Sequence, residues 1–298
     1  MTSKDSFSSY HPFVSLVFFV AVTCFAMFIL QPVCLVISLS GALTYAIYLN
    51  RGKAVRFTLM FMLPLVILAG IFNALFSHQG VTILGYLYDG NPLTFESIVY
   101  GLVSGVMLVT VITWFSSFNV VITTDKIVYL FGRIIPALSL VISMVLRLVP
   151  RYKAQAKVIA GAQRCVGRDP STGNIFRRAR SGIRIVSILV TWALENGIET
   201  ADSMKSRGYG IPGRTAFSLY PLRRRDLIAL GYLACLIALM LTGSLAGALT
   251  YYYIPMFWGE LVGPLQVAIY IGYFALCFMP MAVNLREDLV WRRLLQKT

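Results

Sequence analysis

Long apolar windows constrain the fold of this chain more than any other feature of its sequence. Each of six windows comes close to the ~20 residues that an α-helix needs to cross a bilayer. Charged residues make up only 13% of the chain, about half the share found in soluble proteins. We therefore predict an all-α, polytopic membrane protein with about six transmembrane helices. The predicted spans are Pro12–Leu30, Pro32–Leu49, Phe57–Phe76, Ser97–Ser116, Leu227–Thr250 and Leu265–Val283.

The basic residues predict the orientation of these spans. If the N-terminus is inside, all 26 Lys and Arg fall in inner segments, and the outer connections 77–96 and 251–264 contain none. Loops that face the cytoplasm carry such an excess of positive charge. We therefore predict that both termini are cytoplasmic, and that the net charge of +14 reflects membrane topology rather than binding of nucleic acid. The inner segments are 1–11, 50–56, 117–226 and 284–298.

The chain divides into three predicted regions. Residues 1–124 hold about four spans, 125–226 hold amphipathic cytoplasmic helices, and 227–298 hold about two spans and a basic tail. Within the first outer connection, the strand-like run Val81–Tyr88 precedes an Asp-Gly and an Asn-Pro pair, which are turn signals. A short hairpin and an ordinary loop are both compatible with this pattern.

The middle region begins with an apolar segment that is a poor transmembrane span. Ile127–Leu148 is interrupted by two arginines and a proline, and a charge at mid-bilayer costs about 2.5–3.5 kcal/mol. We predict a shallow or slanted helix near the inner surface, then a mixed helix from Arg151 to Gln163. The interrupting residues are Arg133, Pro136 and Arg147.

A further amphipathic helix is predicted over Ile175–Arg207, after a loop at 169–174. Apolar side chains along it recur at the i, i+3, i+4, i+7 spacing of one helical face. They are Ile185, Ile188, Leu189, Trp192 and Met204, and the polar face carries Glu195, Glu199 and Asp202.

Residues for catalysis are missing from the sequence. The two histidines, His11 and His78, are far apart, and no GxxxxGK[ST] phosphate loop occurs. None of the 12 acidic residues lies in a predicted span, which argues against an ion-coupled transporter. The five cysteines are scattered without CxxC spacing. We predict no enzymatic activity, no cofactor and no metal site.

The end of the last amphipathic helix is the strongest candidate for a binding site. Arg207 closes the helical pattern and is followed by Gly208, which suits a C-terminal cap and the close approach of a partner. The five donors of an arginine form a fixed fork that binds carboxylates or carbonyl oxygens. We predict that Ser206, Arg207 and Gly208 contact a partner protein.

Three motifs occur in order along the chain. N-x-L-F-x-H-x-G runs from Asn73 to Gly80, and L-R-F-[IV]-P corresponds to Leu146–Pro150 with leucine in place of phenylalanine. A-x-x-M-x-A-R-G-[FY] corresponds to Ala201–Tyr209, with Ser206 in place of alanine. In these motifs the chain resembles the transmembrane (T) component of energy-coupling factor transporters, a family typified by the T subunits of cobalt and biotin transporters.

The chain departs from this family at an earlier Ala-Arg-Gly motif. After the Ala-Gln pair that precedes it in the family, the sequence continues Arg164-Cys165-Val166-Gly167-Arg168. Ungapped alignment places Val166 in the arginine position. We predict that Arg164 or Arg168 replaces the missing arginine, and Arg180, in an Ala-Arg-Ser sequence, is the other candidate. An apolar contact through Val166 is the remaining alternative.

The resemblance implies a non-catalytic coupling subunit in the plasma membrane of a prokaryote. It implies two ABC-type ATPase subunits as partners, and a small membrane substrate-binding (S) component that binds a vitamin or metal. The residues predicted to bind the ATPases are Ser206, Arg207, Gly208, Arg164, Val166, Gly167, Arg168 and Arg180. Two alternatives stay open: a membrane insertase or assembly factor that receives polypeptide at Arg133 or Arg147, and an ordinary ABC permease that lines its own substrate path.

Overall fold

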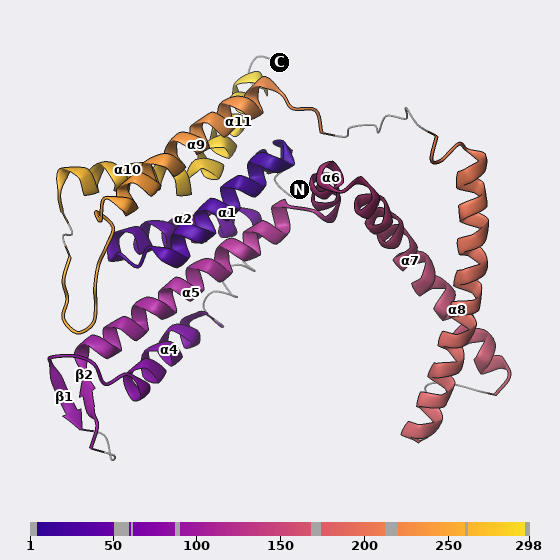
Figure 1. Ribbon diagram of the computed structural model, residues 1–298, viewed down its shortest axis with the longest axis horizontal. Helices are drawn as coiled ribbons and strands as arrows, with labels where there is room; N and C mark the ends of the chain where they lie inside the picture. The colour runs from indigo at the N-terminus through magenta and orange to yellow at the C-terminus, as the bar shows by residue number, and fades with distance from the viewer. Residues whose placement is uncertain are drawn as a thin grey trace. The chain divides into compact units, whose positions relative to one another are not determined.

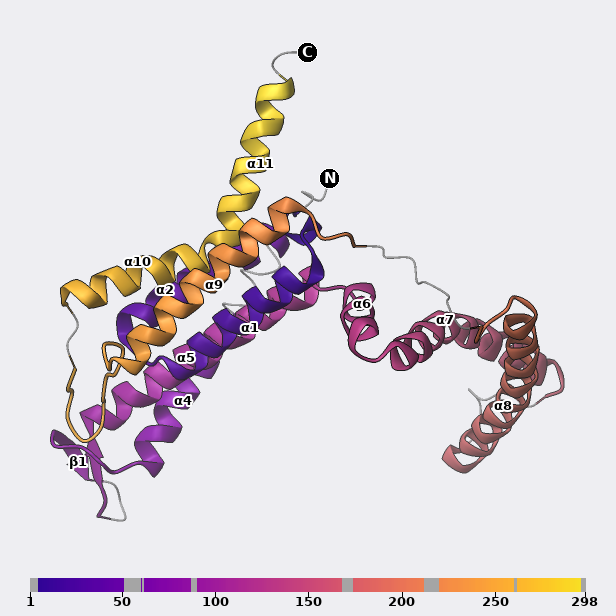
Figure 2. The ribbon, with the colours of Figure 1, turned by 45° about the horizontal axis from the view of Figure 1, so that its top comes forward.

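Two compact units make up the structure. The computed structural model describes residues 5–50, 60, 62–86, 90–167, 174–211, 220–259 and 262–295, with the backbone alone at 133–134, 136–139 and 295. The membrane unit joins Met1–Lys126 to Tyr220–Thr298, and the middle unit is Ile127–Leu219. Figures 1 and 2 show the helices of both units.

Apolar α-helices build the membrane unit. They are α1 (Pro12–Phe28), α2 (Pro32–Asn50), α4 (Leu63–Phe76), α5 (Phe95–Val121), α9 (Arg224–Leu245), α10 (Pro264–Cys277) and α11 (Met279–Leu295), with a 3-10 turn η1 (Phe7–Ser9) before α1. By length and composition, α2, α5 and α9 can each cross a membrane, and α10 with α11 forms a bent pair that passes the same test. The shorter apolar helices are α1 and α4. The all-α, polytopic membrane fold is thereby confirmed.

The sixth predicted span is bent rather than straight. α10 ends at Cys277, α11 begins at Met279, and the two helices diverge by 56° (Figure 2). Pro280 in the first turn of α11 lacks an N–H group, and its ring clashes with the carbonyl four residues earlier. The prediction of one continuous span over Leu265–Val283 was therefore wrong in this respect.

Two glycines let α4 and α5 pack closely (Figure 1). A Cβ atom at Gly101 would lie 2.6 Å from the Cβ of Asn73, and one at Gly105 would lie 2.9 Å from the Cα of Val66. Small residues four positions apart allow helix backbones to approach in lipid, where dispersion contacts replace the hydrophobic effect as the force for association.

Trp114 of α5 forms the centre of the aromatic core. Its side chain is fully buried, and its indole N–H donates to the Ser38 hydroxyl of α2 at 3.1 Å. The rings of Phe18 and Phe19 on α1 lie 5.7 and 6.3 Å from the indole. These contacts hold α1, α2 and α5 together.

A two-stranded hairpin precedes α5. β1 (Ile83–Tyr86) pairs antiparallel with β2 (Pro92–Thr94), so the hairpin alternative is confirmed over the ordinary loop. The Ser97 hydroxyl donates to the Ser77 carbonyl at 2.6 Å, and a Cβ at Gly80 would lie 2.6 Å from a carboxylate oxygen of Glu96. The Asn73–Gly80 motif thus forms the tight junction between α4 and the hairpin.

Three helices form the middle unit and its entry. α6 (Thr124–Ile134) begins in the membrane unit, and α7 (Pro136–Cys165) and α8 (Ile175–Ser206) follow. The predicted helix over Ile127–Leu148 is broken at Ile135, because the residue before a proline is disfavoured in the α region. α7 then continues through Pro150, so a separate helix starting at Arg151 was wrong. Of the predicted loop 169–174, the structure describes Asn174, whose side chain accepts from the Ile175 N–H at 2.8 Å.

Candidate functional site

α7 and α8 pack against each other through an aromatic contact and a polar contact. Tyr152 lies edge-on to Trp192, with ring centroids 5.6 Å apart. The Arg151 guanidinium lies 5.4 Å from the centre of the same indole ring and donates to Asn196 Oδ1 at 2.9 Å. These contacts set how the two helices align along their length.

A groove of about 730 Å³ lies beside this contact. Arg147 and Arg151 line it from α7, and Glu199, Met204 and Arg207 line it from α8. Residues of the second and third motifs, which are far apart in sequence, therefore share one surface. With three guanidinium groups and one carboxylate, the groove presents an excess of hydrogen-bond donors to a partner.

The end of α8 places the Arg207 side chain beyond the last helical turn. Ser206 is the last helical residue, and Arg207 is the C-cap with φ −83° and ψ 7°. Gly208 follows with φ +75°, and the Tyr209 N–H donates to the Met204 carbonyl at 3.0 Å. A residue with φ > 0 that closes the last helical carbonyls is a common C-terminal cap, and glycine adopts it without steric cost. Arg207 is exposed, so its fork is accessible.

The end of α7 repeats this backbone geometry. Cys165 is the last helical residue, Val166 is the C-cap with φ −91° and ψ 14°, and Gly167 has φ +74°. The Gly167 N–H donates to the Arg164 carbonyl at 2.9 Å. Val166, which is 66% exposed, therefore occupies on α7 the place that Arg207 occupies on α8.

The candidate replacement arginines lie elsewhere. Arg164 is exposed in the last turn of α7, two residues before the cap. Arg180 is exposed in the second turn of α8, near the opposite end of that helix from Arg207. Arg168 lies outside the described residues. The structure therefore brings neither Arg164 nor Arg180 to a position equivalent to that of Arg207.

An apolar stripe on α8 was missed in the sequence. Its five side chains are between 51% and 71% exposed, on the side of α8 away from Trp192. The spacing of Ile185, Ile188, Leu189 and Trp192 predicted the face that packs on α7, and the opposite face was expected to be polar. Spacings of three and four residues would also have identified this second face. The stripe consists of Ile183, Val186, Val190, Leu194 and Ile198.

A comparison with known protein families finds a match that includes these two helix ends. Residues 3–217 match the family model CbiQ, described as cobalt transport protein. This chain belongs to that family. The match covers α1 to α8 and therefore includes both helix ends, and it agrees with the resemblance drawn from the three motifs.

Known relatives are transporter membrane subunits. The chain is 37% identical over 105 residues to the energy-coupling factor transporter transmembrane protein EcfT of Lactobacillus helveticus, covering 35% of this chain and 38% of that one. It is 29% identical over 194 residues to EcfT 1 of Listeria monocytogenes, covering 60% and 69%. An EcfT of Lacticaseibacillus paracasei is 34% identical over 105 residues, covering 35% and 40%. The match thus spans about two fifths of the Lactobacillus and Lacticaseibacillus relatives. The family assignment by resemblance is confirmed.

The cap at Gly208 gives a local prediction. Gly208→Ala places a Cβ in the left-handed region, at about 1–2 kcal/mol, and 2.9 Å from the Ile211 Cδ1 atom. We expect amide hydrogen exchange in the last turn of α8 to become about 5- to 30-fold faster. Gly182→Ala is the matched control, because Gly182 is helical and has open space around its Cα. Gly182→Ala should slow amide exchange in the turns of α8 around residue 182, because alanine favours a helix over glycine. Equal exchange rates in the two variants would contradict the cap assigned to Gly208.

Proposed function

We propose that this chain is the coupling component of an energy-coupling factor importer. It transmits the ATP-driven movement of two ABC-type ATPase subunits to a separate small membrane protein that binds a vitamin or metal, and it carries out no catalytic step itself. The observation that carries this proposal is the repeated helix end: α7 and α8 finish with the same cap geometry, and each cap projects one exposed side chain. Two equivalent ends suit a pair of related ATPase subunits.

The α8 end supplies the charged contact. Ser206, Arg207 and Gly208 dock in a groove on one ATPase, where the arginine fork donates to carboxylate or carbonyl oxygens. Charge-assisted, bidentate bonds of this kind are among the strongest between proteins. Gly208 adds no side chain beside the fork, so the ATPase surface can approach the helix end closely.

The α7 end supplies the second contact through Val166 and Gly167. The valine side chain has no hydrogen-bond donor, so it cannot replace the contacts that Arg207 makes. The second ATPase therefore offers an apolar depression to Val166, and the two ATPases differ in sequence. Substitution of the missing arginine by Arg164, Arg168 or Arg180 is the competing account. Support for Val166 comes from its backbone angles and its exposure.

The proposed partners imply the location of the chain. ATP is hydrolysed in the cytoplasm, so the middle unit faces the cytoplasm and both termini lie on the same side. The host membrane is the plasma membrane of a prokaryote, in keeping with the bacterial relatives named above. The distribution of Lys and Arg along the sequence supports the same orientation.

The apolar stripe of α8 is proposed as the surface for the membrane substrate-binding protein. Contiguous exposed apolar side chains often mark contacts with proteins or membranes. A stripe on the helix that also carries Arg207 connects the ATPase end and the substrate-binding protein through one rigid element. Movement of the α8 end would then shift the partner directly.

Leu194→Glu tests the stripe. A buried leucine contributes about 1.5–3 kcal/mol to an interface, so we expect at least tenfold weaker association with the substrate-binding protein, with the ATPases still bound. Leu194→Met is the matched control, because it keeps an apolar side chain of similar size. Co-purification of the three partner types reports the result. Normal recovery of the substrate-binding protein with Leu194→Glu would remove the stripe from the proposal.

Co-purification from the native membrane tests the function as a whole. A tagged chain is expected to bring down two ATPase subunits and a small membrane protein. ATPases without a separate substrate-binding protein, together with transport by that complex, would favour the ordinary ABC permease. Recovery of nascent membrane polypeptides and no ATPase would favour the insertase or assembly factor.

A further inference from the structure

The segment Asp5–His11 lies where the chain leaves the membrane unit for the middle unit and where it returns. Lys126 is the last residue of the membrane unit before the middle unit, and Tyr220 is the first after it. The buried ammonium group of Lys126 donates to the Ser8 carbonyl at 2.6 Å and to the Val121 carbonyl at 2.9 Å. Burial lowers the pKa of Lys126 and nearby Asp5 opposes this shift. The outgoing connection is thus fastened to this segment by a buried charge.

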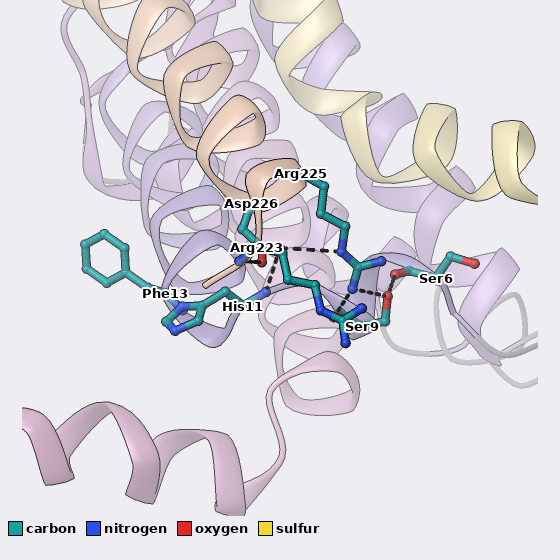
Figure 3. Close-up of polar contacts among 7 residues, drawn as sticks. All are labelled: Ser6, Ser9, His11, Phe13, Arg223, Arg225 and Asp226. Carbon is teal, nitrogen blue, oxygen red and sulfur yellow. Dashed lines mark hydrogen bonds and ion pairs between the residues drawn. The ribbon is translucent and has the colours of Figure 1, made fainter. Parts of the chain in front are cut away.

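The returning connection is fastened to the same segment (Figure 3). Asp226 in the first turn of α9 is 2% exposed and accepts from the His11 N–H at 3.2 Å and the Arg223 N–H at 2.9 Å. The Arg225 guanidinium donates to the Ser9 carbonyl at 2.8 Å and lies 5.0 Å from the centre of the Tyr10 ring. The outgoing and the returning connection therefore both contact the same short segment, Asp5–His11.

Helices α1, α2 and α11 of the membrane unit also contact the segment Asp5–His11. Asn284 of α11 is fully buried; its Oδ1 accepts from the Ser6 N–H at 2.8 Å and the Phe7 N–H at 3.2 Å, and its Nδ2 donates to Asp5 Oδ1 at 2.7 Å. The Tyr45 hydroxyl of α2 donates to Asp5 Oδ2 at 3.0 Å. Phe7 is fully buried, with its ring 5.3 Å from Phe18 and 6.4 Å from Phe19 of α1.

We infer that Asp5–His11 is an N-terminal clamp through which movement of the middle unit reaches α1, α2 and α11. This inference rests on the proposed coupling function and names its positioning residues, Asp5, Asn284 and Arg225. The physical basis is that a buried charge or amide has already given up its contacts with water, so the full cost of desolvation is left uncompensated if its partner moves away. Displacement of either connection therefore moves the clamp and, with it, α1, α2 and α11. Without these contacts the same displacement would only unwind the ends of α6 or α9.

Asn284→Asp opens the clamp with a minimal change of shape. It removes the Nδ2 donor and places a second carboxylate against Asp5, while keeping an acceptor for the Ser6 and Phe7 N–H groups. In the complete transporter reconstituted in proteoliposomes, we expect ATPase binding and ATP hydrolysis to persist. Substrate imported per ATP hydrolysed should fall about tenfold.

The exchanged pair Asp5→Asn with Asn284→Asp is the sharpest control. In the double variant the new amide at position 5 donates to the new carboxylate at position 284, and its oxygen accepts from Tyr45. Import per ATP should return to within about twofold of the wild type. Asp288→Asn, an exposed change on the same helix, should have no effect.

Arg225→Met provides an independent variant that keeps the membrane helices intact, because the guanidinium is partly exposed. It removes the bond to Ser9 and should also lower import per ATP. Unchanged import per ATP in both Asn284→Asp and Arg225→Met would overturn the clamp, as would an exchanged pair that stays uncoupled or a loss of ATPase binding in either variant. Failure of the wild-type chain to bind ATPases is a different outcome, because it would reject the proposed function itself.

Discussion

Replacing Arg207 by glutamate is expected to detach an ATPase subunit from the membrane complex and to lower substrate uptake at least tenfold. The side chain is exposed at the cap of α8, so its loss leaves the acceptors of the partner unpaired at about 1–3 kcal/mol. Glutamate adds repulsion wherever those acceptors are carboxylates. Pull-down of the ATPases and uptake in whole cells measure the effect.

Two further variants separate the role of the fork from that of net charge. Arg207→Lys keeps the charge and loses the planar fork, so an intermediate loss of binding is expected. Arg178→Glu makes the same charge reversal at an exposed site in the first turn of α8 and should leave binding intact. Normal pull-down and uptake with Arg207→Glu would reject the assignment of this helix end to the ATPase.

Val166→Asp is expected to have the second large effect, on the other ATPase. If Val166 fills an apolar depression, its burial contributes about 1.5–3 kcal/mol, and an aspartate there adds the cost of burying an unpaired charge. Binding of that ATPase should fall by tenfold or more. Quantitative pull-down with the two ATPases carrying different tags shows which one is lost.

A combined variant decides between the valine and the arginines. Replacing Arg164, Arg168 and Arg180 together by alanine should leave transport near normal if Val166 makes the contact. Loss of transport in this triple variant, with normal transport in Val166→Asp, would instead assign the contact to an arginine. The single alanine variants would then identify which one.

Local physics made most of the fold predictable. Five of the six apolar windows each contain one apolar helix, and the sixth contains the bent pair α10 and α11. A backbone in lipid must satisfy its own hydrogen bonds, which favours helices in such windows. Pro136 ended one helix and began the next, whereas Pro150 lies inside α7 without ending it. A proline in a sequence therefore marks a weakened helix position, and tertiary packing such as the Tyr152–Trp192 contact decides whether the helix continues.

The candidate site was only partly predictable. The motif of α8 ends a periodic pattern, so its cap could be inferred from Arg207 and Gly208 alone. Ungapped alignment already placed Val166 in the arginine position, but the sequence favoured a nearby arginine, and the backbone angles at the end of α7 were needed to show that Val166 is the residue at the cap. The N-terminal clamp was beyond local inference altogether, because Asp5 and Asn284 are 279 residues apart and neither stands in a recognisable pattern.

The matched ends of α7 and α8 have a consequence for how a complete transporter assembles. If two related ATPases bind these ends as proposed and pair about a pseudo-twofold axis, each ATPase could occupy either end. In the proposed complex, a cation on one end and a valine on the other would make the two arrangements unequal in free energy, because the wrong one would bury a guanidinium in an apolar depression. A difference of about 3 kcal/mol would leave about 99 of every 100 complexes in one orientation. Val166 would then determine which ATPase binds α7 and which binds α8.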